Sequence, residues 1–429
     1  MIAAGHAAES GAQVALLEKT DRPGNKILIS GKSRCNLTNI ADINHFIALY
    51  GSNGRFLFSA FSQYFRDDIL AFLKRYGVET STERDGRIFP SSDDARDVVN
   101  VFRCYLDDNN VQTHYCVNVK KIVTDKGFVI GVQSDSKTYP ARSAILATGG
   151  ASYPTTGSSG DGYRIAGDLG HTIIPIRPSL VPLSVVEKEL ARSMQGVSLR
   201  NVRLTAFKCA ADAIDLSSIP TRDSGRGIPG RHSPALVIES RRGDMIITHF
   251  GLSGPVVLQM SLAIVDALKQ SPVAASIDLY PELSVDKLRE HLQLCFEYHG
   301  KKSVPSMLKI LLPQKLIQPF IEITEIDPDK RCHQISSAER ERLLNSLKSL
   351  RFTIKDALRL AEAMVTAGGV SLKEIDPRTM GSRLVNGLYF CGEVMDIDAE
   401  TGGYNLQAAF STGYVAGEHA AKFVTRLSH

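Results

Sequence analysis

The residues best suited to chemistry lie in one C-terminal segment, 387–417. Its residues predict a buried strand, a turn at 392–393, a second glycine turn at 402–403 and a helix that starts near Tyr404. A glycine pair at a helix start lets a ligand approach bare backbone, and the free N–H groups and the helix dipole there favour anions or electron-rich carbonyls. The segment therefore predicts a cofactor-binding site.

Other segments of the chain combine glycine with small and polar residues in fixed patterns. They are 26–39, 86–90, 147–157 with Asp161 and Gly162, 248–255 and 366–370. Together with 387–417 they resemble the signatures of the YhiN/BaiN-like flavoproteins, a family in the glutathione-reductase-like two-dinucleotide-fold superfamily. The resemblance covers the whole chain, although the family usually has glycines where Lys32 and Ser33 stand.

The resemblance implies an FAD site built from both ends of the chain. Arg34, Cys35 and Asn36 are expected on the isoalloxazine side of the flavin. Asn405 and Gln407 are expected to face its pyrimidine edge from the helix start. The full predicted cofactor-binding set is Glu18, Lys26, Ser30, Gly31, Arg34, Cys35, Asn36, Val119, Thr148, Gly149, Asp161, Gly162, Gly392, Glu393, Gly402, Gly403, Tyr404, Asn405 and Gln407.

Within this set, the resemblance puts Glu393 near the ribityl or pyrophosphate oxygens. Because a carboxylate beside a phosphate is repelled, we expect Glu393 to bind hydroxyl groups; a structural contact at a helix end is the alternative. Val119 is expected beside adenine through its backbone, or else it is simply a buried strand residue. Thr148 and Gly149 are expected where the chain passes the dinucleotide.

The N-terminus looks like the second half of a dinucleotide-binding unit. Residues 2–11 predict a small-residue helix, and 13–17 predict a strand that ends before Glu18, which is placed to bind ribose hydroxyls. The first strand and the G-x-G-x-x-G turn of such a unit are not in this sequence. We therefore expect that Met1 is not the natural start or that the chain has been shortened, and that an extended chain binds FAD more tightly.

The predicted fold class is α/β, with an FAD-binding Rossmann-like domain, an inserted small β-barrel domain and a small helical domain. Short β-like runs such as 204–209, 235–239, 245–249 and 274–279 predict a small barrel or sandwich. Ser284 and the capping box of Ser336 and Glu339 predict helices after the barrel. The predicted domains are 1–183 and 366–429 for FAD, 184–281 for the barrel and 282–365 for the helices.

Composition is that of an ordinary globular chain, with 43% apolar and 22% charged residues and a net charge of +4. Seven cysteines without a Cys-x-x-Cys pair fit neither a zinc ribbon nor a disulfide framework. We expect no metal site, reduced cysteines and a cytoplasmic protein. The N-terminal residues lack the basic flank and apolar core that are typical of a signal peptide, and no uncharged run is long enough to span a bilayer.

The predicted activity is that of an FAD-dependent oxidoreductase, which takes reducing equivalents from NADH or NADPH and reduces an unsaturated acceptor. Flavin itself carries hydride chemistry, so the protein mainly positions it. Cys35 and His249 are the candidate catalytic proton donors, because a thiol or an imidazole can protonate a reduced substrate near neutral pH. Structural roles are the alternatives for both residues.

The acceptor is left open by the sequence. Members of the resembling family are linked to a ribosomal RNA uracil base, to steroid-like bile acid intermediates and to amine oxidation. Ribosomal RNA would need a basic rim, for which the candidates are Arg222, Arg226, Arg231, Arg241 and Arg242. A second class of function, a flavin-binding protein without turnover, is kept because the N-terminal phosphate turn is absent.

Overall fold

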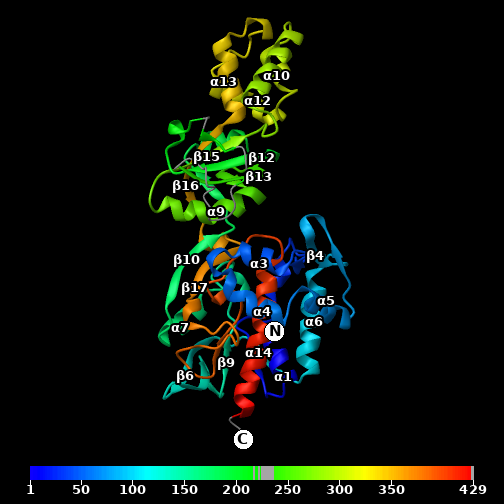
Figure 1. Ribbon diagram of the computed structural model, residues 1–429, viewed down its shortest axis with the longest axis vertical. Helices are drawn as coiled ribbons and strands as arrows, with labels where there is room; N and C mark the ends of the chain where they lie inside the picture. Colours follow the sequence, from blue (N-terminus) through cyan, green and yellow to red (C-terminus); the bar gives the residue numbers. More distant parts are fainter. Residues whose placement is uncertain (216–217, 221–222, 224–235, 427–429) are drawn as a thin grey trace. The chain divides into compact units, whose positions relative to one another are not determined.

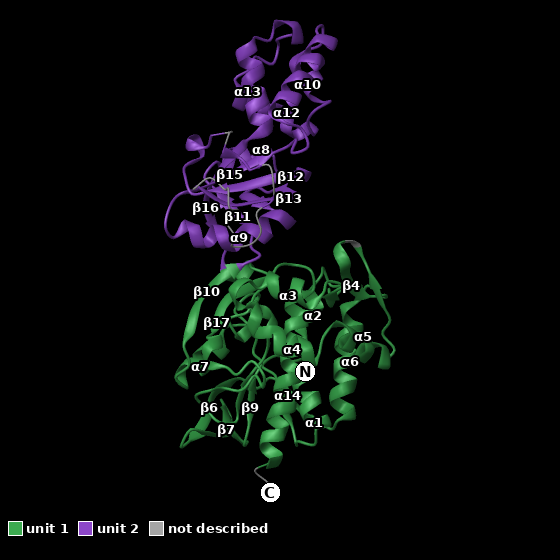
Figure 2. Ribbon diagram, in the orientation of Figure 1, with its two compact units in different colours: residues 1–178, 360–429 green, residues 179–359 purple. Residues whose placement is uncertain are grey.

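The computed structural model describes residues 1–215, 218–220, 223 and 236–426, and it forms two compact units. Unit 1 joins residues 1–178 to 360–429, and unit 2 comprises residues 179–359 (Figure 2). Unit 1 holds every predicted cofactor-binding residue, because these residues come from both ends of the chain. No helix of the described residues is long and apolar enough to cross a membrane.

Unit 1 is built around the C-terminal helix α14 (Tyr404–Arg426), which packs against the N-terminal helix α1 (Ile2–Glu9) (Figure 1). Small residues allow the close contact. A Cβ atom added to Gly413 would lie 2.6 Å from Ile2, and one added to Gly417 would collide with the carbonyl oxygen of Ala3. The small-residue helix predicted at the N-terminus therefore packs on the helix that follows the glycine pair.

Two pairs of parallel strands give unit 1 its α/β character. Strand β1 (Ala15–Leu17) pairs with β5 (Gln112–His114), and β9 (Ala144–Leu146) pairs with β18 (Leu388–Phe390). Because β9 and β18 run in the same direction, the turns that follow them leave from the same edge. This pairing brings the turn after Leu146 close to the turn at 392–393, although the two are far apart in the sequence.

Three further strand groups complete unit 1, and helices pack around them. The strands are β2 (Thr38–Asn39), β4 (Arg87–Pro90) and β3 (Thr80–Thr82); β6 (Val119–Asp125), β7 (Phe128–Ser134) and β8 (Thr138–Pro140); and β10 (Ile173–Ser179) with β17 (Val365–Val370). The helices are α2 (Asn25–Ile29), α3 (Ile43–Leu49), α4 (Phe58–Gln63), α5 (Arg66–Arg75), α6 (Ala95–Asp108) and α7 (Asp161–Asp168).

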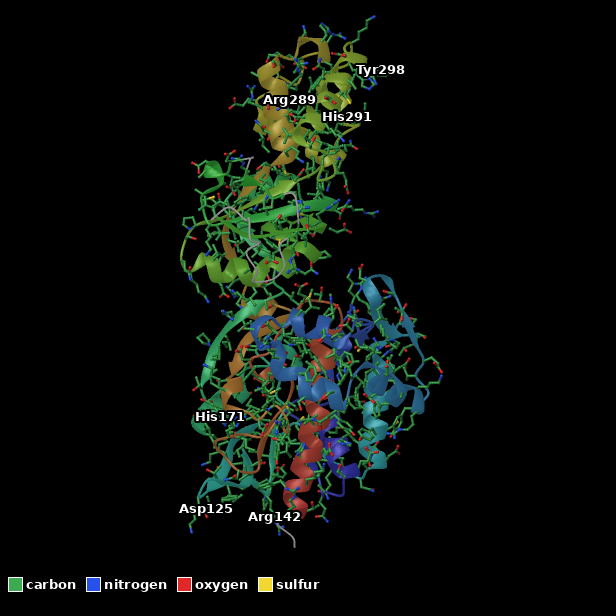
Figure 3. The ribbon with its side chains drawn as sticks, in the orientation of Figure 1. Asp125, Arg142, His171, Arg289, His291 and Tyr298 are labelled. Carbon is green, nitrogen blue, oxygen red and sulfur yellow. The ribbon has the colours of Figure 1, made fainter. Side chains whose placement is uncertain are left out.

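His171, labelled in Figure 3, is buried and contacts the segment that leads into β18. Its Nε2 atom lies 2.9 Å from Ser382 Oγ, and its Nδ1 atom lies 3.3 Å from Glu374 Oε2. The same Ser382 oxygen accepts the backbone N–H groups of Leu384 and Val385. The imidazole, whose pKa burial lowers, thus anchors the turn just before the strand that carries the 392–393 turn.

Unit 2 contains a closed six-stranded barrel, which confirms the predicted barrel. The predicted strands 235–239 and 245–249 overlap one long strand, Val237–Ile247, because the polar residues between them pair with the neighbouring strand. The last barrel strand lies within 282–365, the range that the sequence assigns to helices. In barrel order the strands are β11 (Leu183–Val185), β14 (Gly251–Ser253), β13 (Val237–Ile247), β12 (Ser198–Phe207), β15 (Val273–Asp278) and β16 (Leu350–Ala357).

The helical part of unit 2 lies between strands β15 and β16. Its helix α13 (Ser337–Lys348) begins at the predicted capping box, in which Ser336 Oγ accepts the N–H of Glu339 and the Glu339 carboxylate accepts the N–H of Ser336. The other helices of unit 2 are α8 (Lys188–Ser193), α9 (Pro255–Leu268), α10 (Val285–Tyr298), α11 (Val304–Leu308) and α12 (Gln314–Thr324). Leu343, Leu344 and Leu347 are buried, as expected for residues on the inner face.

Candidate functional site

The glycine pair before α14 packs directly on strand β2. Gly403 has φ +93°, and a Cβ atom added there would lie 2.5 Å from the carbonyl carbon of Thr38. Asn39 Nδ2 donates to the carbonyl oxygen of Gly402 at 3.2 Å. A side chain at Gly403 would therefore collide with backbone, which explains the second glycine independently of any ligand.

Three polar side-chain atoms of the motifs 26–39 and 387–417 are buried and have no hydrogen-bond partner within the described part of the chain. They are Asn36 Oδ1, Thr38 Oγ1 and Gln407 Oε1. Thr38 and Gln407 are fully buried. Each buried polar group without a partner costs about 1–3 kcal/mol, so these three atoms are candidates for hydrogen bonds to a ligand. Among these, Thr38 was not in the predicted set, although it lies inside a predicted motif.

Asn405 and Tyr404 support the turn from within the protein. Both ends of the Asn405 amide bind backbone, since Oδ1 accepts the N–H of Ala399 and Nδ2 donates to the carbonyl oxygens of Ala399 and Glu400. The carbonyl oxygen of Tyr404 accepts the Tyr50 hydroxyl at 2.6 Å. The predicted contact of Asn405 with flavin stays a prediction, and the amide already has its partners in the turn.

A second cluster centres on Glu393, just after Gly392. Lys26 Nζ lies 2.6 Å from Glu393 Oε2 and 2.7 Å from Ser152 Oγ. Glu393 Oε1 accepts the backbone N–H of Thr366 at 2.8 Å and lies 3.4 Å from Ser152 Oγ. Ser152 and Thr366 are fully buried. Helix α2, the turn after β9, strand β17 and the 392–393 turn thus meet at one carboxylate.

Glycines let these turns approach one another. Gly392 has φ +72° and donates its N–H to Thr412 Oγ1 at 3.0 Å, which ties the turn to α14. Gly149 has φ +71°. A Cβ atom on Gly162 would collide with the Thr148 hydroxyl, so this glycine lets α7 pack against the turn after β9. The predicted residues Thr148, Gly149, Gly162, Gly392 and Glu393 therefore lie in neighbouring turns.

The loop before Arg34 adopts an unusual backbone. Gly31, Lys32 and Ser33 have φ values of +56°, +59° and +66°. Lys32 and Ser33, which stand where the resembling family has glycines, thus follow the left-handed path that glycine adopts most easily. Arg34 itself donates to both oxygens of Glu83 at 2.8 and 2.9 Å, so its guanidinium is already engaged by the protein.

Cys35 is fully buried, and its backbone also lies in the left-handed region, with φ +62°. Its N–H donates to the carbonyl oxygen of Ser30 at 3.0 Å, and Ser30 Oγ caps α2 by donating to Ile27. Burial raises the pKa of the Cys35 thiol to about 12. The thiol therefore keeps its proton near neutral pH, and losing it would leave a thiolate in apolar surroundings.

Glu18 and Val119, the residues predicted to bind the adenosine end of FAD, lie on neighbouring segments. Glu18 follows β1, and its Oε1 atom accepts the N–H and the hydroxyl of Thr20. The carbonyl oxygen of Glu18 accepts the N–H of Val117, which places it beside the start of β6, where Val119 lies. Asp161, the first residue of α7, pairs with Lys19 at 2.5 Å, and this pairing lowers the pKa of Asp161.

His249 belongs to unit 2, whereas the predicted flavin residues belong to unit 1. It is exposed in the turn between β13 and β14, and its ring packs edge-on against Phe250 at 5.0 Å. Of the predicted basic rim, Arg222, Arg226 and Arg231 lie outside the described residues, as does nearly all of the loop 221–232. The remaining two arginines form ion pairs: Arg241 with Glu239, and Arg242 with Glu282.

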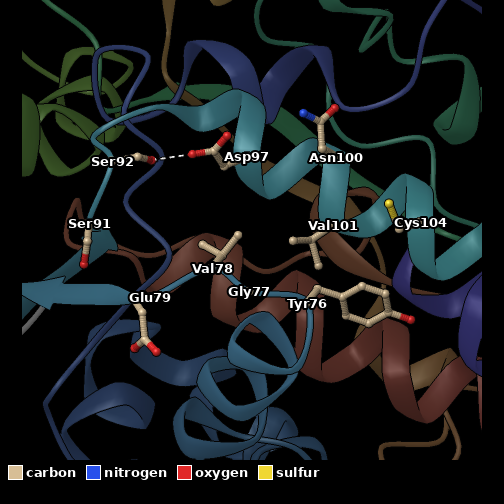
Figure 4. A pocket seen from close by; sticks show the side chains of 10 residues that line it. All are labelled: Tyr76, Gly77, Val78, Glu79, Ser91, Ser92, Asp97, Asn100, Val101 and Cys104. Carbon is tan, nitrogen blue, oxygen red and sulfur yellow. Dashed lines mark hydrogen bonds between the residues drawn. The ribbon is translucent and has the colours of Figure 1, made fainter.

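Two surface hollows lie away from this site. One, of about 480 Å³, is lined by residues 76–79, 91–92 and four residues between 97 and 104, with a hydrogen bond from Ser92 to Asp97 (Figure 4). The other, of about 420 Å³, is lined by residues 121–124 and three residues between 165 and 169. None of the predicted site residues lines either hollow. The described residues also contain no cluster of three His, Cys, Asp or Glu side chains that could hold a metal ion.

Thr38, Ser152 and Thr366 lie at the site but are not in the predicted set. All three are buried hydroxyl residues inside the glycine-containing motifs 26–39, 147–157 and 366–370. A buried hydroxyl in a glycine-rich motif is the signal that could have found them, but burial becomes visible only once the fold is known.

Comparison with known proteins identifies the family. The chain is 33% identical over 414 residues to a 3-dehydro-bile acid delta(4,6)-reductase of Clostridium scindens, an alignment that covers 96% of this chain and 93% of that protein. It is 28% identical over 413 residues to a ribosomal RNA dihydrouridine synthase of Escherichia coli, with the same coverage of 96% and 93%. Among solved structures, the open conformation of a flavocytochrome c3 fumarate reductase matches with a TM-score of 0.47 and 16% identity, over 98% of this chain and 76% of that chain.

The family model described as HI0933-like protein Rossmann domain matches residues 1–419. This match confirms the predicted YhiN/BaiN-like family and its FAD-binding Rossmann-like fold. The protein is a flavoprotein of the oxidoreductase class. The chain belongs to the HI0933-like family.

Proposed function

We propose that this protein binds FAD at the start of α14 and uses NADH or NADPH to reduce an unsaturated acceptor. The observation that carries the proposal is the set of three buried groups without partners, on Asn36, Thr38 and Gln407. The flavin pyrimidine ring presents one N–H donor between two carbonyl acceptors. Amide oxygens can accept from that N–H and a hydroxyl can donate to a carbonyl, so these residues fit the group.

When bound, FAD supplies hydride transfer. The protein's own contribution is to bind and to exclude water: Thr38 and Gln407 are fully buried, so hydrogen bonds that they make to a ligand are shielded from solvent. The glycine pair holds β2 and α14 together, which keeps these two side chains in place. Glu18, Val119 and the turns at 148–149 and 392–393 are the residues proposed to follow the rest of the dinucleotide.

Cys35 and His249 stay the proposed proton donors. The high pKa of Cys35 favours its structural role, since a thiol with a pKa of about 12 gives up its proton reluctantly. We expect Cys35→Ala and His249→Ala to keep bound FAD and its reduction by NAD(P)H, while at least one of them loses acceptor reduction. Unchanged turnover in both variants would remove both candidates.

For the acceptor, we propose a small conjugated molecule rather than an RNA base. The relative at 33% identity is named as a bile acid reductase and the one at 28% as a ribosomal RNA enzyme. The ion pairs of Arg241 and Arg242 also leave these two guanidinium groups less available to phosphates. Salt-sensitive RNA binding that depends on the 222–242 arginines would reverse this preference.

The test is anaerobic reduction of the flavin-loaded protein by NADH or NADPH, followed by addition of a steroid-like enone or a ribosomal RNA fragment. We expect the visible flavin absorbance to be bleached by one nucleotide and restored by the enone. If the RNA fragment restores the flavin absorbance and the enone does not, the protein is an RNA-modifying enzyme. Bound flavin that no nucleotide bleaches would favour a flavin-binding protein without turnover.

A further inference from the structure

The imidazole of His171 contacts strand β18 along two routes. Its side chain is 0% exposed, and its ring packs edge-on against Phe390 of β18, with the ring centroids 4.8 Å apart. The second route runs through Ser382, whose Oγ atom lies 2.9 Å from His171 Nε2. The backbone N–H of Ser382 donates to the carbonyl oxygen of Leu388 in β18 at 2.8 Å. A change at the imidazole therefore reaches β18 and the 392–393 turn that follows it.

The hydrogen bonds of Ser382 decide which form of His171 fits. Ser382 Oγ accepts the backbone N–H groups of Leu384 and Val385 at 3.0 and 2.9 Å, so both of its lone pairs are used. Its own proton is left to point at His171 Nε2, and this nitrogen must then be unprotonated. The ring proton lies on Nδ1, which is 3.3 Å from Glu374 Oε2 in a contact that does not have hydrogen-bond geometry. The arrangement therefore requires a neutral imidazole.

A second proton on the ring would break these hydrogen bonds. Protonated Nε2 would bring a third donor to an oxygen that already accepts two, and the Ser382 hydroxyl would lose its acceptor. Burial also disfavours the charged ring and lowers the pKa of His171, although Glu374 acts in the opposite direction. The two oxygens of Glu374 already accept from the N–H and the hydroxyl of Thr172. The carboxylate thus faces the ring but is shared with other donors.

Other charged side chains of the neighbouring segments are engaged elsewhere. On α7, Arg164 pairs with Asp168 at 3.2 Å, and Arg383 in the turn donates to a backbone carbonyl. The folded protein therefore prefers neutral His171, whereas an unfolded chain takes up the proton near the ordinary pKa of 6.5. The contribution of His171 to stability is complete well above pH 6.5, and it is lost as the pH falls through 6.5 towards the lower pKa of the folded protein.

We propose that His171 is a pH-dependent switch for cofactor binding: the neutral imidazole holds the turn 382–385 and β18 in place, and protonation releases them and loosens the 392–393 turn. The inference rests on the proposed flavin function, because the 392–393 turn belongs to the proposed dinucleotide site. His171 acts through this turn, so it is a positioning residue. The expected result is a protein that holds FAD near neutral pH and releases it in mild acid.

The test is titration of the flavin-free chain with FAD at about pH 7.5 and about pH 5.5, on either side of the ordinary histidine pKa. We expect the affinity of the parent to fall about fivefold or more in acid, the lower end of a typical coupling between two sites. His171→Gln keeps a neutral acceptor for the Ser382 hydroxyl at both pH values, so its affinity should fall less than about twofold. His419→Gln is the matched control: burial also lowers the pKa of His419, which lies on α14, and its variant should show the same fall as the parent.

Linkage gives a second measurement on the parent itself. If protonation of His171 weakens FAD binding, bound FAD must lower the apparent pKa of His171, and carbon-13 NMR of labelled histidine rings follows that pKa. An equal fall of affinity in His171→Gln and in the parent would overturn the proposal, and so would an imidazole titration that FAD does not move.

A parent that binds no FAD at either pH would instead refute the proposed function. Urea unfolding of the flavin-free chain then decides whether His171 is a switch. An acid decrease of the urea midpoint that is smaller in His171→Gln than in the parent would support the switch, and equal decreases would overturn it.

Discussion

Gly403→Ala should destabilise unit 1 strongly, and the structure gives the size of the effect. The added Cβ atom would lie 2.5 Å from the carbonyl carbon of Thr38, which belongs to backbone and cannot turn away. Overpacking of this kind costs about 1–3 kcal/mol. The left-handed conformation of Gly403, with φ +93°, adds about 1–2 kcal/mol for any other residue. We expect the flavin-free variant to lose about 2–5 kcal/mol of unfolding free energy in urea.

Gly127→Ala is the matched control for the steric part of this loss. Gly127 lies in unit 1 with φ +80°, and a Cβ atom added there would meet no atom within 4 Å. Its variant should therefore lose only the conformational part, about 1–2 kcal/mol. If the two variants have the same urea midpoint, the contact between Gly403 and Thr38 does not limit the packing of β2 on α14, and the explanation of the second glycine is wrong.

Three other changes test separate features. Lys32→Gly should raise the unfolding free energy by about 0.5–1 kcal/mol, because glycine adopts the left-handed conformation of this exposed position with less strain than lysine. A loss of stability would show that the Lys32 side chain makes a compensating contact. Cys35 has a pKa of about 12 in the folded protein against an ordinary 9.0, so its contribution to stability is complete below pH 9 and falls as the pH rises towards 12. Cys35→Ala should therefore reduce the alkaline decrease of the urea midpoint. An unchanged dependence of the urea midpoint on pH would contradict the raised pKa. Lys330 and Ser336 lower the pKa of Glu339 to about 2, so its contribution to stability is complete above pH 4.5 and is lost as the pH falls through about 2. Glu339→Gln should therefore reduce the loss of α13 helicity at acid pH, measured by circular dichroism. An equal loss of helicity in both proteins would refute the role of this carboxylate.

Features set by neighbouring residues could be predicted from the sequence. The capping box at Ser336 and Glu339 has its two members three residues apart, and it forms as expected. The turn at Gly402 and Gly403 was predicted from the helix that follows it. Turn and cap chemistry is local, so spacing alone carries the information.

Features set by distant segments could not be predicted in the same way. The partner of Gly403 is Thr38, from the other end of the chain, and Arg34 is engaged by Glu83, which is 49 residues away in the sequence. Polar residues around Arg241 look like a break between two strands, yet they continue one barrel strand because the neighbouring strand supplies backbone partners. Tertiary pairing decided these cases, and local propensity did not.

The central claim is that a flavin completes the buried groups of Asn36, Thr38 and Gln407, and titration with FAD tests it most directly. Thr38→Val and Gln407→Leu remove hydrogen-bonding groups at nearly constant volume, and Thr425→Val is a control later in α14, where the hydroxyl already donates to Ala421. We predict one FAD per parent chain, weaker binding by about 3- to 10-fold in each of the first two variants, and no change in the control. A parent that binds no FAD, or two site variants that bind it as tightly as the parent, would contradict the account.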